Sequence, residues 1–441
     1  MPDHAILPSE VQAREFDAKL LTACFLAERG LSSIVGARHH IHNRLAHLPA
    51  NVYLAKDVAR PSRRILNLMS QMGIQAALLD EEALVFTSTE GYLSRRVDPE
   101  AASTISRAYA WGPRSAELMA RLPGAQNRPL LETGNPRMDL LRPELQGFHD
   151  RAMQEIRRGH GPLILFNSNF GMLNPMTYAK NRRPEVLKAQ HPDILALMER
   201  RRQTFHAFVE LLPQIARAFP DHQLVIRPHP AEAPSAWKPV ADAVPNCSIV
   251  SSGQSVPWML AAVATLHNGC TTGFESFLMG KVPISYRGII QTPDDTLSPD
   301  LFSQIVQKPD EVIEAIKARI NGLPPAPTQA QKDALTRHLT ASGGRFAAER
   351  LADDLANFPD GMGRFHLGGR IKAQLRGWEK VVKGLVPSNK ASARSNAHRY
   401  PGVPVTLIEE KLTDLRRTLG RFDDVQAVPL GHDIYRIRPK G

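Results

Sequence analysis

Short apolar runs alternate with helix-patterned stretches along most of the chain, and this alternation limits the fold more than any other feature. The strand-length apolar runs near the N-terminus are 5–8, 32–36, 52–54 and 76–79. Phe16, Leu20 and Cys24 recur between the first two runs at helical spacing. Strands that alternate with helices predict an α/β fold with a parallel sheet, in which ligands bind at the carboxyl ends of the strands.

The alternation resumes after a polar stretch at residues 144–161, which predicts a boundary between two domains. The later apolar runs are 162–166, 223–226, 248–251, 261–266 and 282–286, of which 261–266 fits either the end of a helix or a buried strand. A chain of 441 residues is long enough for two domains and an appendage. We expect domains over 1–145 and 160–345, followed by a basic helical and α+β appendage over 360–441.

The composition is that of a soluble globular protein, with 42% hydrophobic and 22% charged residues. The longest apolar window, near 256–266, is too short to span a bilayer, and the N-terminus lacks a secretory pattern. Cys24, Cys247 and Cys270 have no disulfide or metal-ligand spacing, which favours a reducing cytosol and predicts no metal site. The net charge of +11 favours an anionic partner, although it also serves solubility.

Polar residues follow the expected strands of the first domain. They are Glu10 and Arg14 after the first strand, Arg38 after the second, and Asp80, Glu81 and Glu82 after the fourth. Glu10 and Arg14 also fit an ordinary helix start. We assign Glu10, Arg14 and Arg38 to the acceptor side of a candidate site.

The acidic triplet is the candidate for a general base. Close carboxylates repel one another, so one of them can have a raised pKa. If extended geometry continues past the strand, Glu81 points away from Asp80 and Glu82. We therefore expect Glu82 to be the base, with Asp80 second and Glu10 third; the alternative is a solvated turn that caps the next helix.

Three loops at strand ends in the second domain carry groups suited to an anionic ligand. They contain Asn167, Ser168 and Asn169; Arg227 and His229; and Thr271, Thr272 and Glu275. Two prolines keep the Arg227–Pro230 loop rigid, so that the side chains of Arg227 and His229 can both donate to phosphate oxygens. The small residues of the third loop precede a short helix and leave backbone N–H groups directed at one point. Glu275 could reach a ribose there. The alternative is a capped loop without a ligand.

Several enzyme classes lack support in the sequence. There is no Walker-type phosphate loop, no Gly-x-Gly-x-x-Gly after the first strand and no Gly-x-Ser-x-Gly elbow. Kinase, dinucleotide oxidoreductase and serine hydrolase functions are therefore not expected.

Residues 364–399 form a basic, Trp-containing amphipathic segment. Arg370, Lys372, Arg376 and Lys380 surround Trp378 and apolar residues at helical spacing. Such a segment suits an anionic membrane surface, or else a helix packed on its own protein with a solvated basic face. Nucleic acid is not expected as a partner, because no recognition motif accompanies the charge. Residues 388–397 read as a flexible break and 403–437 as a small α+β tail.

Short motifs, each modest alone, are specific in their order and spacing. They are Arg14–Leu20, Asp80–Leu84, Ala110–Gly112, Thr133–Asp139, Arg227–Pro230 and Cys270–Glu275, with a weaker patch at His398–Gly402. On these motifs, which span most of residues 5–290, the chain resembles the bacterial surface carbohydrate biosynthesis proteins. Those group with capsule-type transferases: the Kdo transferases, polysialyltransferases and CDP-glycerol glycerophosphotransferases.

The resemblance implies a GT-B fold, in which two Rossmann-like domains face each other across a cleft. The acceptor would bind the first domain and a cytidine nucleotide donor the second, with no essential metal or other cofactor. In the wider group a carboxylate–carboxylate–Gly motif is linked to base catalysis and a His-Pro motif to the donor phosphate. Asp80-Glu81-Glu82 and His229-Pro230 match these motifs, except that Ala83 stands where many relatives have Gly.

We therefore expect a cytosolic glycosyltransferase, peripheral on the inner face of the plasma membrane, that builds a surface or capsule polysaccharide. It would transfer an acidic ulosonic sugar such as Kdo from a CMP-activated donor to a glycan or glycolipid acceptor. His229, with Arg227 and the helix start at Thr271, would bind the CMP phosphate and stabilise its departure. The alternatives are a CDP-glycerol or polyol-phosphate transferase, and a non-catalytic scaffold that binds nucleotide or glycan.

Overall fold

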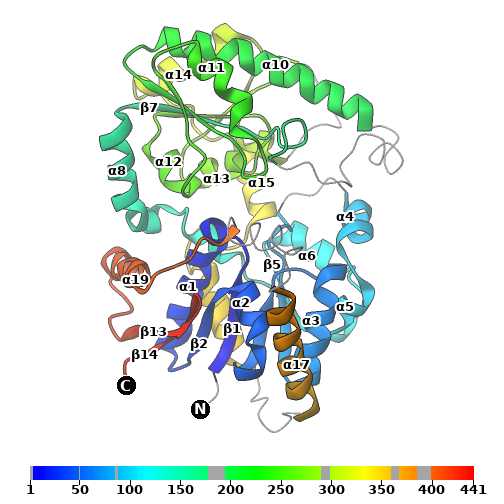
Figure 1. Cartoon of the computed structure of the whole chain (residues 1–441). Helices are drawn as coiled ribbons and strands as arrows, with labels where there is room; N and C mark the ends of the chain where they lie inside the picture. The colour runs from blue at the N-terminus through cyan, green and yellow to red at the C-terminus, as the bar shows by residue number, and fades with distance from the viewer. Residues whose placement is uncertain are drawn as a thin grey trace. The chain divides into compact units, whose positions relative to one another are not determined.

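The computed structural model of the chain describes residues 3–48, 50–84, 88–176, 194–289, 298–358, 367–384 and 399–441. The chain divides into two compact units (Figure 1). One consists of Met1–Phe148 together with Leu335–Gly441, and the other of His149–Ala334. The first unit is therefore discontinuous in sequence, because the chain leaves it to form the second unit and then returns.

An eight-stranded sheet, counted over the described residues, is the centre of the first unit, in the order β13-β14-β2-β1-β3-β4-β5-β6. Its strands are β1 (Asp3–Ser9), β2 (Ser33–Ala37), β3 (Ala50–Ala55), β4 (Gln75–Leu79), β5 (Ile105–Ala110), β6 (Leu130–Glu132), β13 (Val425–Gly431) and β14 (Ile434–Pro439). Strands β1 to β6 pair in parallel, as the strand–helix alternation predicts. The hairpin β13–β14 adds to the edge of β2 in antiparallel fashion.

Helices cover this sheet and fill the connections between its strands. They are α1 (Gln12–Glu28), α2 (Arg38–Asn43), η1 (Leu45–His47), α3 (Arg60–Gln71), α4 (Thr89–Arg96), α5 (Pro99–Ser103), α6 (Pro113–Met119), η2 (Ala125–Asn127), α7 (Pro136–Asp139), η3 (Pro143–His149), α16 (Ala347–Ala356), α17 (Leu367–Gly384) and α19 (Val405–Leu419). Helix α15 (Gln329–His338) begins in the second unit and ends in the first. Helix α1 is buried continuously from Glu15 to Ala27, because the sheet, α7 and α16 all pack against it. Its polar residues Asp17 and Lys19 are buried with the rest, so they must be paired.

The C-terminal residues do not form an appendage of their own, in contrast to the expectation for 360–441. Residues 335–441 belong to the first unit. Strand β14 hydrogen-bonds to β2, and α16 packs on α1. The carboxylate of Asp139 accepts hydrogen bonds from the backbone N–H groups of Ala347 and Ala348, at 2.9 and 2.7 Å, at the start of α16. The returning chain therefore completes the first unit.

The second unit contains a sheet of six parallel strands among the residues described, in the order β12-β11-β10-β7-β8-β9. The strands are β7 (Leu163–Asn167), β8 (Gln223–Arg227), β9 (Cys247–Ile249), β10 (Ala264–His267), β11 (Ile284–Tyr286) and β12 (Gln304–Val306). The helices are α8 (Asp150–His160), α10 (Ile194–Ala218), η5 (Pro234–Trp237), α11 (Lys238–Asp242), α12 (Ser255–Ala261), α13 (Thr272–Leu278), η7 (Ser298–Phe302) and α14 (Pro309–Ile320). The ambiguous run at 261–266 contains both the end of α12 and most of β10.

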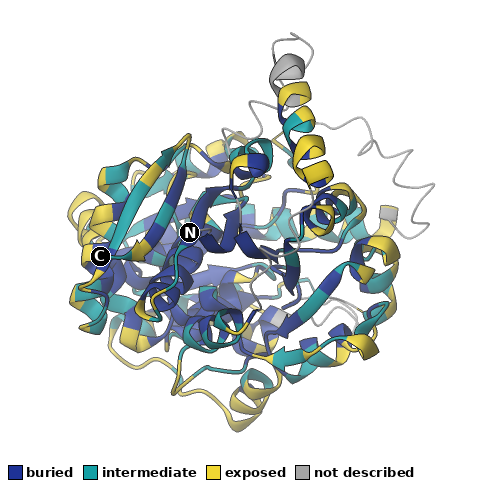
Figure 2. Ribbon diagram, turned by 90° about the horizontal axis from the view of Figure 1, so that it is seen from below, coloured by how far each residue is buried: buried dark blue, intermediate teal, exposed yellow. Residues whose placement is uncertain are grey.

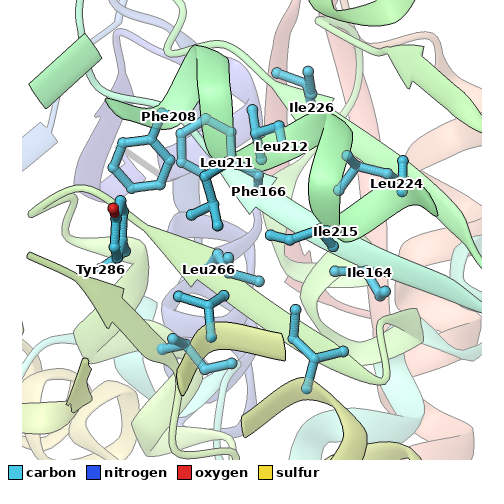
Figure 3. Close-up of a cluster of buried hydrophobic side chains, with 14 of the residues drawn as sticks. Ile164, Phe166, Phe208, Leu211, Leu212, Ile215, Leu224, Ile226, Leu266 and Tyr286 are labelled. Carbon is cyan, nitrogen blue, oxygen red and sulfur yellow. The ribbon is translucent and has the colours of Figure 1, made fainter. Parts of the chain in front are cut away.

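The core of the second unit lies between its sheet and α10. Figure 3 shows Phe208, Leu211 and Ile215 of α10 beside Phe166 and Leu266 of the strands. The rings of Phe166 and Phe208 are stacked with centroids 4.6 Å apart. The helical spacing of these residues predicts this buried face. In the described part of the chain no helix combines the length and apolar character needed to cross a membrane.

Candidate functional site

Four neighbouring strands of the first sheet end at a common edge, and charged side chains follow each of them. The order β2-β1-β3-β4 places Arg38, Glu10, Lys56 and Asp80 side by side along this edge. Because the strands are parallel, residues far apart in sequence meet there. The predicted residues Glu10, Arg14, Arg38, Asp80 and Glu82 all lie in this region of the first unit.

Glu10 is the centre of a cluster of positive charges. Its carboxylate lies 2.6 Å from Arg38 Nη1, 2.6 Å from Lys56 Nζ and 2.5 Å from Arg399 Nη1. Burial alone would raise the pKa of Glu10, but Lys56 and Arg38 outweigh it and lower the pKa to about 2. Glu10 is therefore held as a carboxylate, which makes it unsuitable as a base near neutral pH.

Neither Lys56 nor Arg399 was predicted as a site residue from the sequence. Arg399 lies within the weak motif patch at His398–Gly402, and Gln12 fixes the same segment. The Gln12 side chain donates to Gly402 O at 2.8 Å and accepts from Gly402 N at 3.0 Å. A residue from near the C-terminus is thus brought to the first strand, a contact that no local pattern could indicate.

The acidic triplet is separated into three different environments. Residues 81–84 form a turn, so the extended geometry assumed from the sequence ends at Asp80. The side chains of Asp80, Glu81 and Glu82 are 2%, 1% and 42% exposed, respectively. Glu82 is consequently the member of the triplet that solvent can reach.

Asp80 is a buried carboxyl group with a network of donors. It accepts hydrogen bonds from the Tyr92 hydroxyl and from Glu82 N, the latter at 2.8 Å, and Arg96 lies 3.9 Å away. Burial raises the pKa of Asp80 to about 6, although the hydrogen bonds and Arg96 oppose the shift. Its bond to Glu82 N also fixes the backbone from which Glu82 projects.

Glu81 and Glu82 each form an ion pair with α1. Glu81 lies 2.7 Å from Lys19 Nζ, with Arg137 at 3.6 Å. Burial alone would raise the pKa of Glu81, but Lys19 and Arg137 reverse the effect and lower it. Glu82 lies 2.8 Å from Arg14 Nη1 at the start of the same helix. These pairs join two motifs that are more than 60 residues apart in sequence.

Two further motif residues, Trp111 and Arg137, contact the triplet or its backbone. The Trp111 indole donates to the backbone oxygen of Asp80 at 2.7 Å. The guanidinium of Arg137 lies 5.8 Å from the centre of the Trp111 ring. Trp111 and Arg137 therefore belong to the scaffold of the site, and their presence in short motifs was the available sequence signal.

In the second unit, the three predicted loops follow neighbouring strands in the order β10-β7-β8. Asn167 pairs with Arg227 on one side and with His267 on the other. Asn169 N donates to Asn268 Oδ1 at 2.8 Å, and Ser168 N donates to Arg227 O at 2.9 Å. The three loops are thus tied together at one edge of the second sheet.

Ser168 is engaged in holding its loop in place. Its hydroxyl lies 2.8 Å from both carboxylate oxygens of Glu232, which is fully buried. Glu232 also accepts from Phe170 N at 3.0 Å and from the Trp237 indole at 2.7 Å. Glu232 was missed from the sequence, since a lone acid in an Ala- and Pro-rich stretch gives no sign of burial.

The Arg227 side chain likewise points inward and contacts other residues of the second unit. Its two terminal nitrogens donate to Ser252 O at 2.9 Å and Gly253 O at 3.0 Å, and its guanidinium lies 5.2 Å from the Trp258 ring centre. Burial lowers the pKa of Arg227 to about 10. Its principal contacts hold the 252–253 turn, which differs from the expected outward orientation toward a phosphate.

His229 is exposed, in contrast to Arg227 of the same loop. Its Nδ1 accepts a hydrogen bond from Ala231 N at 3.1 Å. The neutral ring therefore carries its proton on Nε2, where it can act as a donor.

The third loop is shaped by a buried histidine. His267 Nδ1 accepts from Gly269 N at 3.1 Å, and Nε2 lies 2.8 Å from the Ser303 hydroxyl. Burial and the nearby Arg287 lower the pKa of His267 to about 3, so the ring is neutral. A Cβ at Gly273 would lie 2.6 Å from His267 Nε2, so only glycine fits there.

The predicted residues of this loop differ in exposure. Thr271 is exposed, whereas Thr272 and Glu275 are 9% and 8% exposed. Thr271 and His229 are thus the predicted groups that face outward, together with the partly buried Asn169. Across the described ranges, no three His, Cys, Asp or Glu side chains are placed to share a metal ion.

No protein-family model and no curated protein sequence matches the chain. Solved structures do resemble it, among them the following two. The UDP-GlcNAc 2-epimerase of Neisseria meningitidis, bound to UDP-GlcNAc, is 13% identical over 81% of this chain and 99% of its own, with a TM-score of 0.50. A variant of the wall teichoic acid polymerase TagF, soaked with CDPG, is 12% identical over 82% of this chain and 89% of its own, with a TM-score of 0.50. Both have the GT-B fold, which confirms the predicted fold class.

Proposed function

We propose that the chain is a GT-B transferase of surface polysaccharide biosynthesis, with a nucleotide-activated donor on the second unit and a hydroxyl acceptor on the first. The observation that carries this proposal is the accessible carboxylate of Glu82, held by Arg14 above the buried Asp80. A sugar hydroxyl is too weak an acid to attack unaided at neutral pH, so a base must take its proton. Glu82 meets this requirement better than the enclosed Asp80 and Glu81.

The donor is assigned to the strand-end loops of the second unit. The His229 Nε2–H and the N–H and hydroxyl groups near Thr271 supply neutral donors for phosphate oxygens. Arg227 and Glu232 hold the loops that present these groups. Two GT-B structures with bound UDP-GlcNAc or soaked CDPG support a nucleotide-linked ligand. The resemblance of the sequence to capsule-type transferases favours a CMP-activated acidic sugar.

In this reaction Glu82 removes the acceptor proton as the acceptor oxygen bonds to the anomeric carbon of the donor. The bond from that carbon to the phosphate oxygen breaks, and CMP leaves. His229 stabilises the charge that develops on the departing phosphate.

Transfer of a polyol phosphate from a CDP-alcohol is the second candidate, and the likeness to TagF favours it. The acceptor oxygen would attack the phosphorus that carries the polyol, and CMP would again leave. The two reactions therefore give the same nucleotide product and differ in the acceptor linkage.

A donor panel tests the proposal. Purified protein is incubated with a glycan acceptor and CMP-, CDP- or UDP-linked donors, and nucleotide release and acceptor mass are followed. Acceptor-dependent CMP release is expected, and a new phosphodiester in the product would select the polyol-phosphate reaction. Conversion of UDP-GlcNAc without an acceptor would overturn transfer in favour of epimerisation. Nucleotide binding without turnover of any donor would identify a scaffold.

A further inference from the structure

Helix α17 is attached to the first unit by a face of small residues. It runs along the outside of α3, α2 and η1 (Figure 1). A Cβ at Gly369 would lie 2.1 Å from Gln71 O, and one at Gly377 would lie 2.6 Å from Asn43 O. Ala373, between them at helical spacing, is 3% exposed. No larger side chain fits at the two glycines, so the rotation of α17 about its own axis is fixed.

The opposite face of α17 is an exposed apolar stripe, made of Leu367, Ile371, Leu375 and Trp378. These side chains are 73%, 52%, 56% and 62% exposed. Their spacing of four, four and three residues aligns them along one side of the helix. Figure 2 shows exposed residues along the outer helices. Such a contiguous patch is typical of an interaction surface.

Positive charge flanks the stripe. Arg370 and Lys372 are exposed on α17, and each also donates to the unit, to Ala46 O and Gln71 Oε1 respectively. Arg376 is half-buried near Arg64 of α3, which is 76% exposed and lies 3.9 Å from Glu379. Glu379 is the single acidic residue in the sequence between 364 and 399. The stripe and its cations together have the character of a helix that lies in a membrane interface.

We propose that the stripe on α17 inserts into the interface of an anionic phospholipid bilayer, with the helix axis parallel to the membrane plane. Pairing with a second copy through the same stripe would bring two sets of Arg and Lys side chains together, whereas acidic headgroups neutralise them. The glycine-lined contact leaves the stripe no route to the interior of its unit. This surface is independent of the proposed transfer reaction.

The intrinsic fluorescence of the protein provides a direct probe. Of the four tryptophans, Trp111, Trp237 and Trp258 are 1%, 0% and 7% exposed, whereas Trp378 is 62% exposed. Vesicles of phosphatidylcholine with about one third phosphatidylglycerol should shift the emission to the blue, and brominated lipids should quench it. Pure phosphatidylcholine or high salt should weaken both signals. Unchanged emission with anionic vesicles at low salt overturns the proposal.

Matched variants separate the stripe from general surface effects. Leu375→Glu should lower the partition coefficient in vesicle flotation by roughly tenfold or more, since a buried Leu side chain is lost. Lys372→Glu should lower it by roughly fivefold and reduce its dependence on salt. Leu323→Glu, at a 70% exposed leucine of the second unit, is the control and should behave like wild type.

The oligomeric state decides between the membrane and a second copy of the chain. A monomer by light scattering, with or without Leu375→Glu, agrees with the proposal. A dimer that Leu375→Glu dissociates, with no flotation of the wild-type protein, would assign the stripe to self-association. Equal flotation of Leu375→Glu and wild type would also overturn the proposal, once circular dichroism shows that both are folded.

Discussion

The carboxyl edges of the two sheets differ in how they hold charge. At the first edge Glu10, Asp80, Glu81 and Glu82 each have at least one cation within 4.0 Å. At the second edge the charged groups, Arg227 and Glu232, contact neutral partners, and no ion pair joins them in the described residues. The remaining contacts are made by backbone amides, Asn side chains and histidines that accept hydrogen bonds. The first edge thus holds its carboxylates in different electrostatic environments, with the pKa of Asp80 raised and those of Glu10 and Glu81 lowered. The second edge offers neutral hydrogen-bond donors at His229 and Thr271, which suit an anion that binds and dissociates.

Glu82→Gln should have the largest effect. It keeps the shape of the side chain and removes its basicity, so turnover should fall by roughly 10²–10⁴-fold, the usual contribution of a general base. Nucleotide affinity, measured by calorimetry, should be unchanged because the donor loops lie on the second unit. Glu90→Gln, at an exposed carboxylate paired with Arg121, is the control. Near-normal turnover in folded Glu82→Gln would contradict the assignment of Glu82 as the base, and equally normal turnover in Asp80→Asn would exclude the acidic triplet.

Lys19→Met tests whether the stability of the first unit depends on the buried ion pair between Lys19 and Glu81. It leaves Glu81 buried with Arg137 3.6 Å away as its nearest remaining cation. Breaking a buried pair from one side costs about 3–5 kcal/mol of unfolding free energy. Arg121→Met, which breaks an exposed pair, should cost about 0–1 kcal/mol. Similar denaturation midpoints for the two variants would contradict this account.

The pH dependence of stability tests the buried state of Asp80. Its pKa is about 6 in the folded protein against an ordinary value of 3.8, so the folded state retains a proton that the unfolded chain loses. The free energy of unfolding should therefore fall as pH rises from about 4 to 6. Asp80→Asn removes this pH-dependent contribution to the free energy of unfolding. The difference in free energy of unfolding, variant minus wild type, should therefore rise by about 3 kcal/mol across that window. Parallel pH profiles would show that Asp80 is not buried as described.

His229→Ala should have the smallest effect, and it concerns the second edge. Loss of one hydrogen bond to a charged phosphate should weaken CMP binding by roughly 1.5–3 kcal/mol. His222→Ala, just before β8 at its opposite end, is the control. Arg227→Ala should weaken binding by releasing the turn at 252–253, with a loss of stability that His229→Ala does not share. If calorimetry finds unchanged affinity in both variants, the nucleotide does not bind these loops.

The local patterns of the sequence were sufficient to predict the α/β class and most strand positions. Apolar runs and helical spacing are short-range properties, and parallel topology then brings strand ends such as Glu10 and Asp80 together. The partners of those residues were not predictable, because Lys19, Glu232 and Arg399 become neighbours only through the tertiary fold. The turn at 81–84 replaced the extended geometry assumed for Glu82. The apolar spacing of α17 was visible, but its outward orientation depends on the fit of Gly369 and Gly377.

The hairpin β13–β14 has a consequence for synthesis on the ribosome. The second unit is one continuous stretch, His149–Ala334, so all of it emerges before the chain returns to the first unit. The first sheet, by contrast, keeps the edge of β2 unpaired until Ile434–Ile437 is made. An unpaired edge strand is a template for association with other chains. Translation therefore leaves this edge of β2 exposed until Ile434–Ile437 has emerged and pairs with it.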